Sequence, residues 1–369
     1  MREAAQSVMK PFRVLSLDGG GMRGIYTAEY LSCLAAGFSK RTGRADLDIG
    51  KGFDLIVGTS TGAIVACALV AGVPLKRVVS LYKNSGRLIF PRRVPTGIPS
   101  ALPDLVQRPA ALKRGSKALQ SALTAAFGTE TVGQVFTRRG IPLAVTAVNL
   151  SNHRGWVFKT PHRLGKTNHR DDAYSLVDVC LASSAAPVYR SVAAIETPGH
   201  KGHFDTFIDG GLWANNPILV GLIDALEVAA PEQPIELYAL GTCPRPAGTS
   251  ITPKEVHRGL KEWKFGGEAA VIAIDAQEFT FDHMAKLLAP HLRHDCQVIR
   301  FPREAVPASM MNYLDLDDTR SEAANALIGL ARTDADLTNS RCSDPNDPHG
   351  SLLRALFESM PEFEVREEK

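Results

Sequence analysis

The fold of this chain is decided near its start, where residues 12–21 read FRVLSLDGGG. A short aliphatic run that stops at a cluster of glycines is typical of a buried strand entering a tight loop. The pattern returns at residues 53–62, which read FDLIVGTSTG, and apolar residues at helical spacing follow each turn, over 25–38 and 63–71. Two strand–turn–helix units in succession predict an α/β fold in a single domain, with a mostly parallel central sheet sandwiched between helices.

The composition is that of an ordinary folded protein. The chain has 369 residues, of which 44% are hydrophobic and 22% charged, and its formal net charge is +3. This charge is too small to predict binding to a nucleic-acid polymer. The first ten residues lack the apolar core of a signal peptide, and the longest apolar stretch falls short of the about 20 residues of a membrane span. Six scattered cysteines without a Cys-x-x-Cys motif indicate a reducing compartment, so the cytoplasm is the expected location.

Further elements are predicted along the rest of the chain. Aliphatic runs predict strands over 141–149, 156–159, 206–208, 235–240 and 296–301. Helical spacing predicts helices over 174–185, 217–229, 267–288 and 319–335. The sequence shows no internal repeat and no linker clear enough to divide the chain, so we expect one domain over 12–340, followed by a C-terminal helical tail over 341–369.

Residues 85–117 differ from the rest of the chain. They contain five prolines and many Lys and Arg residues, with Asp104 as the only acid. This composition predicts a loop insertion or lid, and two interpretations stay open: a membrane-facing element or a solvated surface excursion. In the first, the contact with lipid comes from apolar side chains beside the basic ones, namely Leu88, Ile89, Phe90 and Ile98.

Ser60 lies at the centre of residues 58–62, which fit the Gly-x-Ser-x-Gly pattern of nucleophilic serines. Gly58 and Gly62 let the chain turn sharply from strand to helix and present the hydroxyl group. The start of the helix also supplies free backbone N–H groups and the positive end of the helix dipole. Ser60 is therefore a candidate nucleophile, and the alternative is a tight turn capped by a serine.

The loop over residues 18–24, DGGGMRG, has two interpretations. Gly19, Gly21 and Gly24 spell the Gly-x-Gly-x-x-Gly pattern of a dinucleotide site. Such a site needs a strand ending in an acid about 20 residues later, where this chain has a predicted helix. The other interpretation is an oxyanion hole, in which the amides of residues without side chains converge on one oxygen. Arg23 would then orient the loop or add positive charge.

Asp209 ends another strand-like run, in residues 207–217, FIDGGLWANNP. With Gly210 and Gly211 behind it, the acid is expected to repeat the strand–turn–helix geometry of the two earlier segments. Its carboxylate would then lie at the same sheet edge as Ser60 and take the serine proton directly. The alternative is an acid that only bonds the backbone of its own turn.

These three segments, together with ASSAAP at residues 182–187, resemble the patatin-like phospholipase family. The resemblance runs from about Phe12 to Pro217 and, more weakly, to residues 314–318, LDLDD; segment 85–117 has no counterpart in it. It implies the patatin-like fold, a lipid acyl hydrolase of phospholipase A type and a catalytic dyad of Ser60 and Asp209. It also implies an oxyanion hole in the glycine loop, with the residues Gly19, Gly20, Gly21, Met22 and Arg23.

The chain is similar, in its length and its start, to bacterial phospholipases that cyclic dinucleotides switch on in anti-phage defence. This similarity implies a cyclic-dinucleotide activator. Four basic residues are candidates to contact its phosphates, Arg92, Arg93, Lys113 and Arg114, and no residue pattern selects among them.

Other residues offer alternatives to the Ser-Asp dyad. A Ser-His-Asp triad would use a later histidine, for which the chain offers His257, His283, His291 and His294. The last three of these, and His200 and His203 with Asp205, suggest a metal site, but their spacing fits no standard ligand set. A third alternative is a non-catalytic nucleotide-binding or interaction module on the same fold.

The expected partners follow from the hydrolase interpretation. We expect membrane phospholipids, met at the inner membrane surface, as substrates. We expect no metal, no cofactor and no nucleic-acid polymer, and the sequence predicts no oligomeric state.

Overall fold

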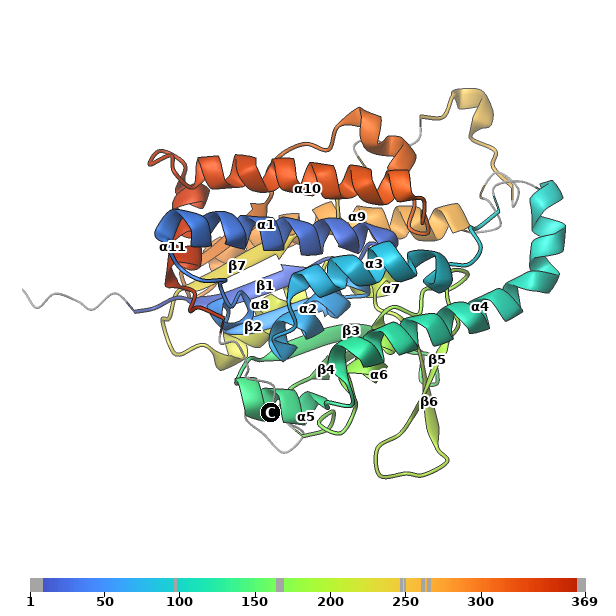
Figure 1. The fold of residues 1–369 in the computed structure, drawn as a ribbon, viewed down its shortest axis with the longest axis horizontal. Helices are drawn as coiled ribbons and strands as arrows, with labels where there is room; N and C mark the ends of the chain where they lie inside the picture. The colour runs from blue at the N-terminus through green and yellow to red at the C-terminus, as the bar shows by residue number, and fades with distance from the viewer. Residues whose placement is uncertain are drawn as a thin grey trace, which may run out of the picture.

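The computed structural model describes residues 9–95, 98–163, 169–245, 248, 250–259, 263 and 267–363. In this part of the chain eight strands form one sheet in the order β5-β6-β3-β2-β1-β7-β8, with β4 also paired to β3. The strands are β1 (Phe12–Leu17), β2 (Leu55–Thr59), β3 (Leu143–Asn149), β4 (Arg154–Lys159), β5 (Ala193–Glu196), β6 (Phe204–Asp209), β7 (Ile235–Leu240) and β8 (Cys296–Phe301). Figure 1 shows helices on both sides of this sheet.

The centre of the sheet is parallel. Strands β3, β2, β1, β7 and β8 run in one direction. Every residue of β1 is buried, which is the pattern of a parallel strand covered on both faces. The mostly parallel α/β sheet predicted from the first two glycine turns is therefore confirmed.

Of the remaining strands, β4 and β6 run in the opposite direction to this parallel group, and β5 runs in the same direction. β4 and β6 are antiparallel to β3, and β5 is antiparallel to β6. The expectation that Asp209 repeats the geometry of the two earlier turns is therefore wrong in strand direction, because hydrophobic alternation does not encode direction. β5 was not predicted, since its four residues are too few to show a pattern.

The helices form two layers. They are α1 (Gly24–Thr42), α2 (Thr61–Ala71), α3 (Leu75–Ile89), α4 (Ile98–Phe127), α5 (Val132–Arg139), α6 (Leu176–Ser183), α7 (Gly211–Ala214), α8 (Ile218–Val228), α9 (Gly267–Leu288), α10 (Ser321–Arg341) and α11 (Pro348–Ser359). Helices α8 and α9 cover one face of the sheet, and the larger core on the other face includes α1, α2, α3, α6 and α10. None of the helices in the described ranges is long and apolar enough to span a bilayer.

The basic, proline-rich segment 85–117 is mostly helical. It comprises the end of α3, a short connection and much of α4, which contains Pro103 and Pro109 and bends in Figure 1. Proline can kink a helix without ending it, which is why the prediction of a loop was wrong. The only acid of the segment, Asp104, accepts a hydrogen bond from Arg92 Nε at 2.9 Å and pairs with Arg108.

The C-terminal segment contains α11, which packs into the larger core. The ring of Phe357 stacks on that of Phe38, with 4.8 Å between centroids. Arg44 donates hydrogen bonds to the carbonyl oxygens of Phe357 and Met360, which lie at the end of the helix. The described chain therefore ends against α1 and not away from the domain.

Candidate active site

Ser60 occupies the tight turn between β2 and α2. Its φ is 55°, an unusual value for a residue with a side chain, and its N–H donates a hydrogen bond to Ser183 Oγ at 2.7 Å. The turn is close-packed, because a Cβ at Gly62 would meet the carbonyl oxygen of Leu17 in β1. The same crowding, by other neighbours, applies to the further motif glycines Gly24, Gly58 and Gly210.

Asp209 reaches Ser60 because β2 and β6 share one edge of β3. β4 pairs with residues 144–149 and so occupies the other edge. On the shared edge, β2 pairs with residues 143–146 and β6 with residues 147–149. The two strands run toward each other, so their C-terminal ends meet. The antiparallel strand thus brings the acid to the position that the sequence led us to expect.

Ser60 and Asp209 form a direct contact. Ser60 Oγ donates a hydrogen bond of 2.7 Å to Asp209 Oδ2, and the Gly211 N–H donates one of 2.7 Å to Asp209 Oδ1. The two residues are buried, with exposed fractions of 8% and 6%. Burial raises the pKa of Asp209 to about 6, while both hydrogen bonds and the charge of Arg190 oppose the rise. Such a carboxylate is ionised at neutral pH and is more basic than an exposed one.

The glycine loop lies beside Ser60, and three of its amides are already bonded. Each donates to a backbone carbonyl oxygen: Gly19 to Asn215 at 2.9 Å, Met22 to Leu316 at 2.9 Å and Arg23 to Gly20 at 3.1 Å. Within the described residues, no hydrogen bond uses the amides of Gly20 and Gly21, and both residues line the pocket that contains Ser60. The geometry therefore leaves these two amides as candidate oxyanion donors.

The directions of these two amides are set by the carbonyl groups of the same peptides. The Gly19 carbonyl, which shares a peptide plane with the Gly20 N–H, accepts hydrogen bonds from Thr242 Oγ1 at 2.9 Å and Asn215 Nδ2 at 3.4 Å. Because a trans peptide points its N–H away from its C=O, fixing the carbonyl also aims the amide. Gly21 has a φ of 57°, and a Cβ there would meet the Leu316 carbonyl oxygen.

Arg23 supports the loop from behind and does not line the pocket. Its side chain is only 1% exposed; Nε donates to the Gly20 carbonyl at 3.3 Å and Nη1 to the Cys243 carbonyl at 3.3 Å. The Gly20 carbonyl shares a peptide with the Gly21 N–H, so Arg23 aims the second free amide. Of the two roles considered from sequence, orientation of the loop is the one that fits this geometry.

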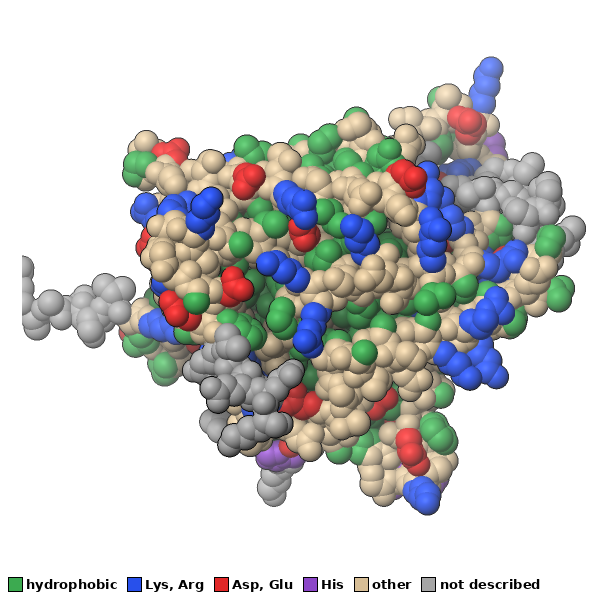
Figure 2. All heavy atoms as spheres, in the orientation of Figure 1, with side chains coloured by type: hydrophobic (Ala, Val, Ile, Leu, Met, Phe, Trp, Pro, Cys, Tyr) green, Lys and Arg blue, Asp and Glu red, His purple; other side chains and the backbone are tan. Residues whose placement is uncertain are grey.

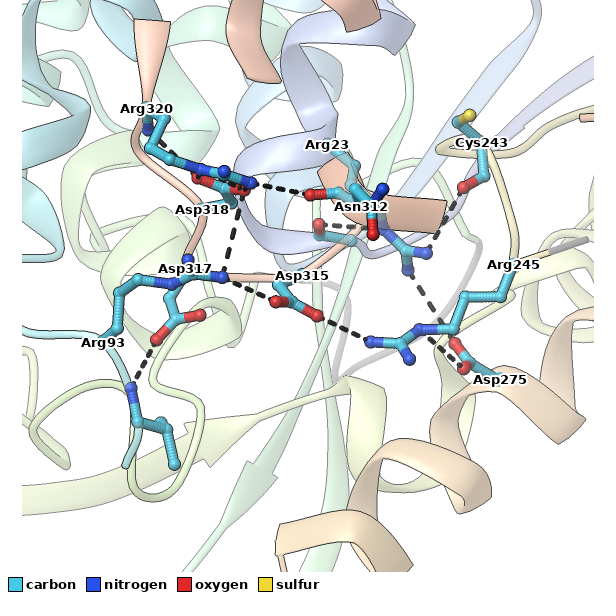
Figure 3. A network of polar contacts seen from close by, with 12 residues as sticks. Arg23, Arg93, Cys243, Arg245, Asp275, Asn312, Asp315, Asp317, Asp318 and Arg320 are labelled. Atoms are coloured by element: carbon cyan, nitrogen blue, oxygen red, sulfur yellow. Dashed lines mark hydrogen bonds and ion pairs between the residues drawn. The ribbon is translucent and has the colours of Figure 1, made fainter. Parts of the chain in front are cut away.

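A polar network extends from Arg23 to the connection between α3 and α4 (Figure 3). Arg23 lies 3.9 Å from Asp275, and Asp275 lies 3.9 Å from Arg245. Arg245 and Arg93 pair with Asp315 at 3.0 Å and 2.6 Å. This network holds the LDLDD loop, residues 314–318, against the glycine loop.

A pocket opens onto the dyad, with a cavity volume of about 60 Å³. Its walls are largely apolar, and the apolar residues that line it are Ile64, Tyr82, Ile89, Phe90, Leu119, Ala186, Tyr189, Ile274 and Leu316. The polar residues of the lining include Ser60, Asp209 and Arg190. An apolar pocket with a few polar groups is the usual form of a site for an apolar ligand.

Several site residues were missed by sequence reasoning. Ser183 and Asn215 lie inside the quoted motifs ASSAAP and FIDGGLWANNP. The sequence therefore pointed to their segments but predicted no role for either residue. Leu316 likewise lies inside the quoted segment LDLDD, whereas Arg190 had no such signal, because only the tertiary fold brings it to the pocket.

Other candidates from sequence lie outside the pocket. Among the described residues that line it there is no histidine, so none of His257, His283, His291 and His294 contacts the dyad. In the described ranges no cluster of three or more His, Cys, Asp or Glu residues could hold a metal ion, and this includes His200, His203 and Asp205. The Ser60–Asp209 contact thus has no intervening group.

The proposed lid and phosphate-binding residues have different environments. Leu88 is 63% exposed, whereas Ile89 is buried and lines the pocket together with Phe90; the side chain of Ile98 lies outside the described residues. Arg92 and Arg93 are paired with Asp104 and Asp315, and Lys113 and Arg114 are exposed on α4. The structure does not gather these four basic residues into one site.

Comparison with known proteins gives similarities of sequence. The profile of the patatin-like phospholipase family matches residues 15–222. A cGAMP-activated phospholipase of Pseudomonas aeruginosa is 34% identical over 277 residues, which cover 74% of this chain and 74% of the relative. Proteins of the same name from Escherichia coli and Vibrio cholerae are 37% and 29% identical; the matches cover 59% and 87% of this chain and 57% and 89% of the relatives.

Proposed function

Because this chain belongs to the patatin-like phospholipase family, we propose that it cleaves fatty-acyl esters of membrane phospholipids with Ser60 as nucleophile and Asp209 as base. The observation that carries the proposal is the direct hydrogen bond of 2.7 Å between Ser60 Oγ and Asp209 Oδ2 beside an apolar pocket. A nucleophile and a base in contact are the minimum for covalent acyl transfer.

The proposed reaction has two halves. Asp209 takes the Ser60 proton while Oγ forms a bond to the ester carbonyl carbon; the resulting tetrahedral intermediate expels the lysophospholipid alkoxide, which receives that proton. In the second half Asp209 takes a proton from water, the water oxygen attacks the acyl-enzyme, and Ser60 Oγ leaves with that proton. The fatty acid is released and the dyad returns to its starting state.

Backbone amides stabilise the charge that develops in both halves. The free N–H groups of Gly20 and Gly21 are the proposed donors to the oxyanion, and Thr242, Asn215 and Arg23 hold them in direction. Because these donors are fixed before the substrate arrives, little reorganisation is needed during the reaction.

The membrane surface is proposed to meet the protein around the pocket mouth. Two exposed apolar residues, Leu88 (63% exposed) and Val188 (49%), are the chain neighbours of Ile89 and Tyr189 in the pocket lining. Val106 (82% exposed) lies on α4, whose Arg108 donates a hydrogen bond to the Val188 carbonyl oxygen. Lys and Arg side chains lie along α4, as Figure 2 shows, and would attract the anionic cytoplasmic leaflet.

We expect Leu88→Asp with Val106→Asp to weaken vesicle binding without slowing hydrolysis of a soluble ester. Ile223→Asp on α8 is the matched control, and equal binding by all three proteins would refute this surface.

An activator is proposed from the relatives and from the size of the pocket. The relatives are named cGAMP-activated phospholipases, and a cavity of about 60 Å³ has room for a few water molecules but not for a long acyl chain. We propose that a cyclic dinucleotide opens the pocket by loosening the network between α3–α4 and the LDLDD loop. Arg93→Gln removes its ion pair with Asp315 and is then expected to raise hydrolysis without nucleotide.

The decisive test is fatty-acid release from mixed phospholipid vesicles, with and without a panel of cyclic dinucleotides including cGAMP. The proteins compared are the wild type, Ser60→Ala and Asp209→Asn, with exposed Ser80→Ala and Asp336→Asn as controls. Release that only the first two substitutions abolish supports the dyad. Release that survives Asp209→Asn moves the base elsewhere, and no release by the wild type under any condition contradicts the hydrolase proposal.

A further inference from the structure

The pocket contains a cation that the dyad chemistry does not use. Arg190 lines the pocket together with Ser60 and Asp209, and it is only 7% exposed. Among the described residues that line this pocket, it is the only Lys, Arg or His. The buried Arg190 guanidinium therefore needs either a structural partner within the protein or an anionic ligand in the pocket.

No structural partner is present within the described part of the chain. Arg190 Nε is buried without a hydrogen-bond acceptor, and the guanidinium forms no ion pair with a described carboxylate. Burial lowers the pKa of Arg190 to about 10, so the group remains cationic at neutral pH. The charge of Asp209 acts on Arg190 without a direct ion pair, so the buried guanidinium is only partly compensated, and a ligand anion in contact with it would relieve the remaining penalty.

The surroundings fix how the guanidinium is presented. Its Cζ lies 5.7 Å from the centre of the Phe90 ring, which supports the planar group by a cation–π contact. Phe90 belongs to the connection after α3, and it also lines the pocket. The remaining N–H groups of Arg190 are thus available to a molecule that occupies the pocket.

We infer that Arg190 binds the phosphate of the substrate headgroup, so that this site selects glycerophospholipids over uncharged acylglycerols. The inference rests on the proposed function and names the substrate class of the same site. Only the glycerol carbons separate the phosphate from the acyl esters, so both groups can occupy one pocket. The fork of Arg donors matches two phosphate oxygens, and a lysine would not reproduce it.

The charge of Asp209 gives a second reason for a cation here. A phosphate that enters beside this carboxylate is repelled by it, and it would also raise the pKa of the base. The Arg190 guanidinium opposes both effects, since it already lowers the pKa of Asp209. The glycine-loop amides remain free for the oxyanion.

The test compares two soluble substrates that differ in the phosphate group, dihexanoyl phosphatidylglycerol and dihexanoylglycerol, at pH 8. Arg190→Gln is expected to lower the ratio of their kcat/KM values by about 10- to 100-fold, the range for a hydrogen bond to a charged group. Arg190→Lys should restore part of the ratio, and Arg77→Gln, an exposed charge on α3, should leave it unchanged. Equal losses on both substrates would overturn the inference and assign Arg190 to the dyad or the oxyanion.

Two further measurements do not depend on hydrolysis. Titration calorimetry, with and without cGAMP, should detect dihexanoyl phosphatidylglycerol binding to Ser60→Ala, and Arg190→Met in that background should abolish it. Absence of binding to Ser60→Ala under both conditions overturns the inference, whereas binding without wild-type hydrolysis supports Arg190 and rejects the proposed function. Arg190→Met should melt no lower than the wild type, because an unpaired buried charge is removed. A large fall in the melting temperature would show a structural role instead.

Discussion

Protonation of Asp209 is expected to switch off the chemistry on the acid side of neutrality. Burial raises the pKa of this carboxyl to about 6, and only its ionised form can take the Ser60 proton. At pH 7 about nine-tenths of the enzyme is then active. At pH 5 only about one-tenth is, so kcat/KM falls by roughly tenfold between these values.

The assay is the hydrolysis of a soluble short-chain acylglycerol between pH 4.5 and 9, which avoids any effect of pH on membrane binding or on a phosphate group. A plot of log kcat/KM against pH should rise with a slope of about one at acid pH and reach a plateau above about pH 6; this rising part is the acid limb. Circular dichroism at each pH shows whether the protein is still folded where the rate has fallen.

Assignment of the limb to Asp209 needs a perturbation that acts on this group. The positive charge of Arg190 lowers the pKa of Asp209, so Arg190→Gln should move the limb to higher pH. Burial also raises the pKa of Asp18, but that acid is paired with Arg300 at 3.0 Å and should not respond to Arg190→Gln. A limb near pH 4, or one that Arg190→Gln leaves in place, would refute the reasoning.

Three other substitutions test the turn and the loop, and a fourth, in α10, is a control. Ser60→Gly should abolish hydrolysis and, by calorimetry, melt above Ser60→Ala, because glycine relieves a positive φ that costs about 1–3 kcal/mol. Gly62→Ala should lower the free energy of unfolding, measured in urea, by at least about 1 kcal/mol, because the added methyl group meets a β1 carbonyl oxygen. Gly329→Ala in α10 is the control: the glycine has open space around it, so the substitution should raise the free energy of unfolding by about 0.5–1 kcal/mol. Arg23→Met should lower kcat for a soluble ester with little change in KM, since it frees the Gly20 carbonyl and misdirects an oxyanion donor.

The parts of the site that could be predicted are those with a local signature. The turn at Ser60 needs glycines on both sides, because a Cβ at Gly62 would meet β1 and a Cβ at Gly58 would meet the Gly62 carbonyl oxygen. Five consecutive residues therefore show this requirement in the sequence. The glycine loop and the residues around Asp209 have the same property. Each of these segments also ends a strand, so the sequence predicted that they lie close together, although Asp209 arrives on an antiparallel strand whose end meets that of β2.

The parts that could not be predicted depend on contacts between distant segments. Arg190 enters the pocket through a loop whose sequence resembles any surface turn, and Leu316 reaches Gly21 across almost three hundred residues. The direction of β6 follows from its pairing with β3, which strand pattern alone does not encode. The bend in α4 was missed because prolines and charges suggest a loop unless the pairing of Asp104 with Arg92 and Arg108 is known.

The three central groups of the site all weaken the fold that holds them. The pKa of Asp209 is raised from 3.8 to about 6, which corresponds to about 3 kcal/mol of stability lost at neutral pH. The folded state holds the Asp209 proton more tightly than the unfolded state does. The loss of stability is therefore absent below pH 3.8, grows as the pH rises, and is complete above about 6. Ser60 adds a strained backbone, and Arg190 adds an unpaired charge. A structural group would destabilise the protein when replaced, whereas replacing any of these three by an uncharged or unstrained residue should stabilise it. Stabilisation that coincides with loss of hydrolysis would therefore distinguish a functional site from a packing feature.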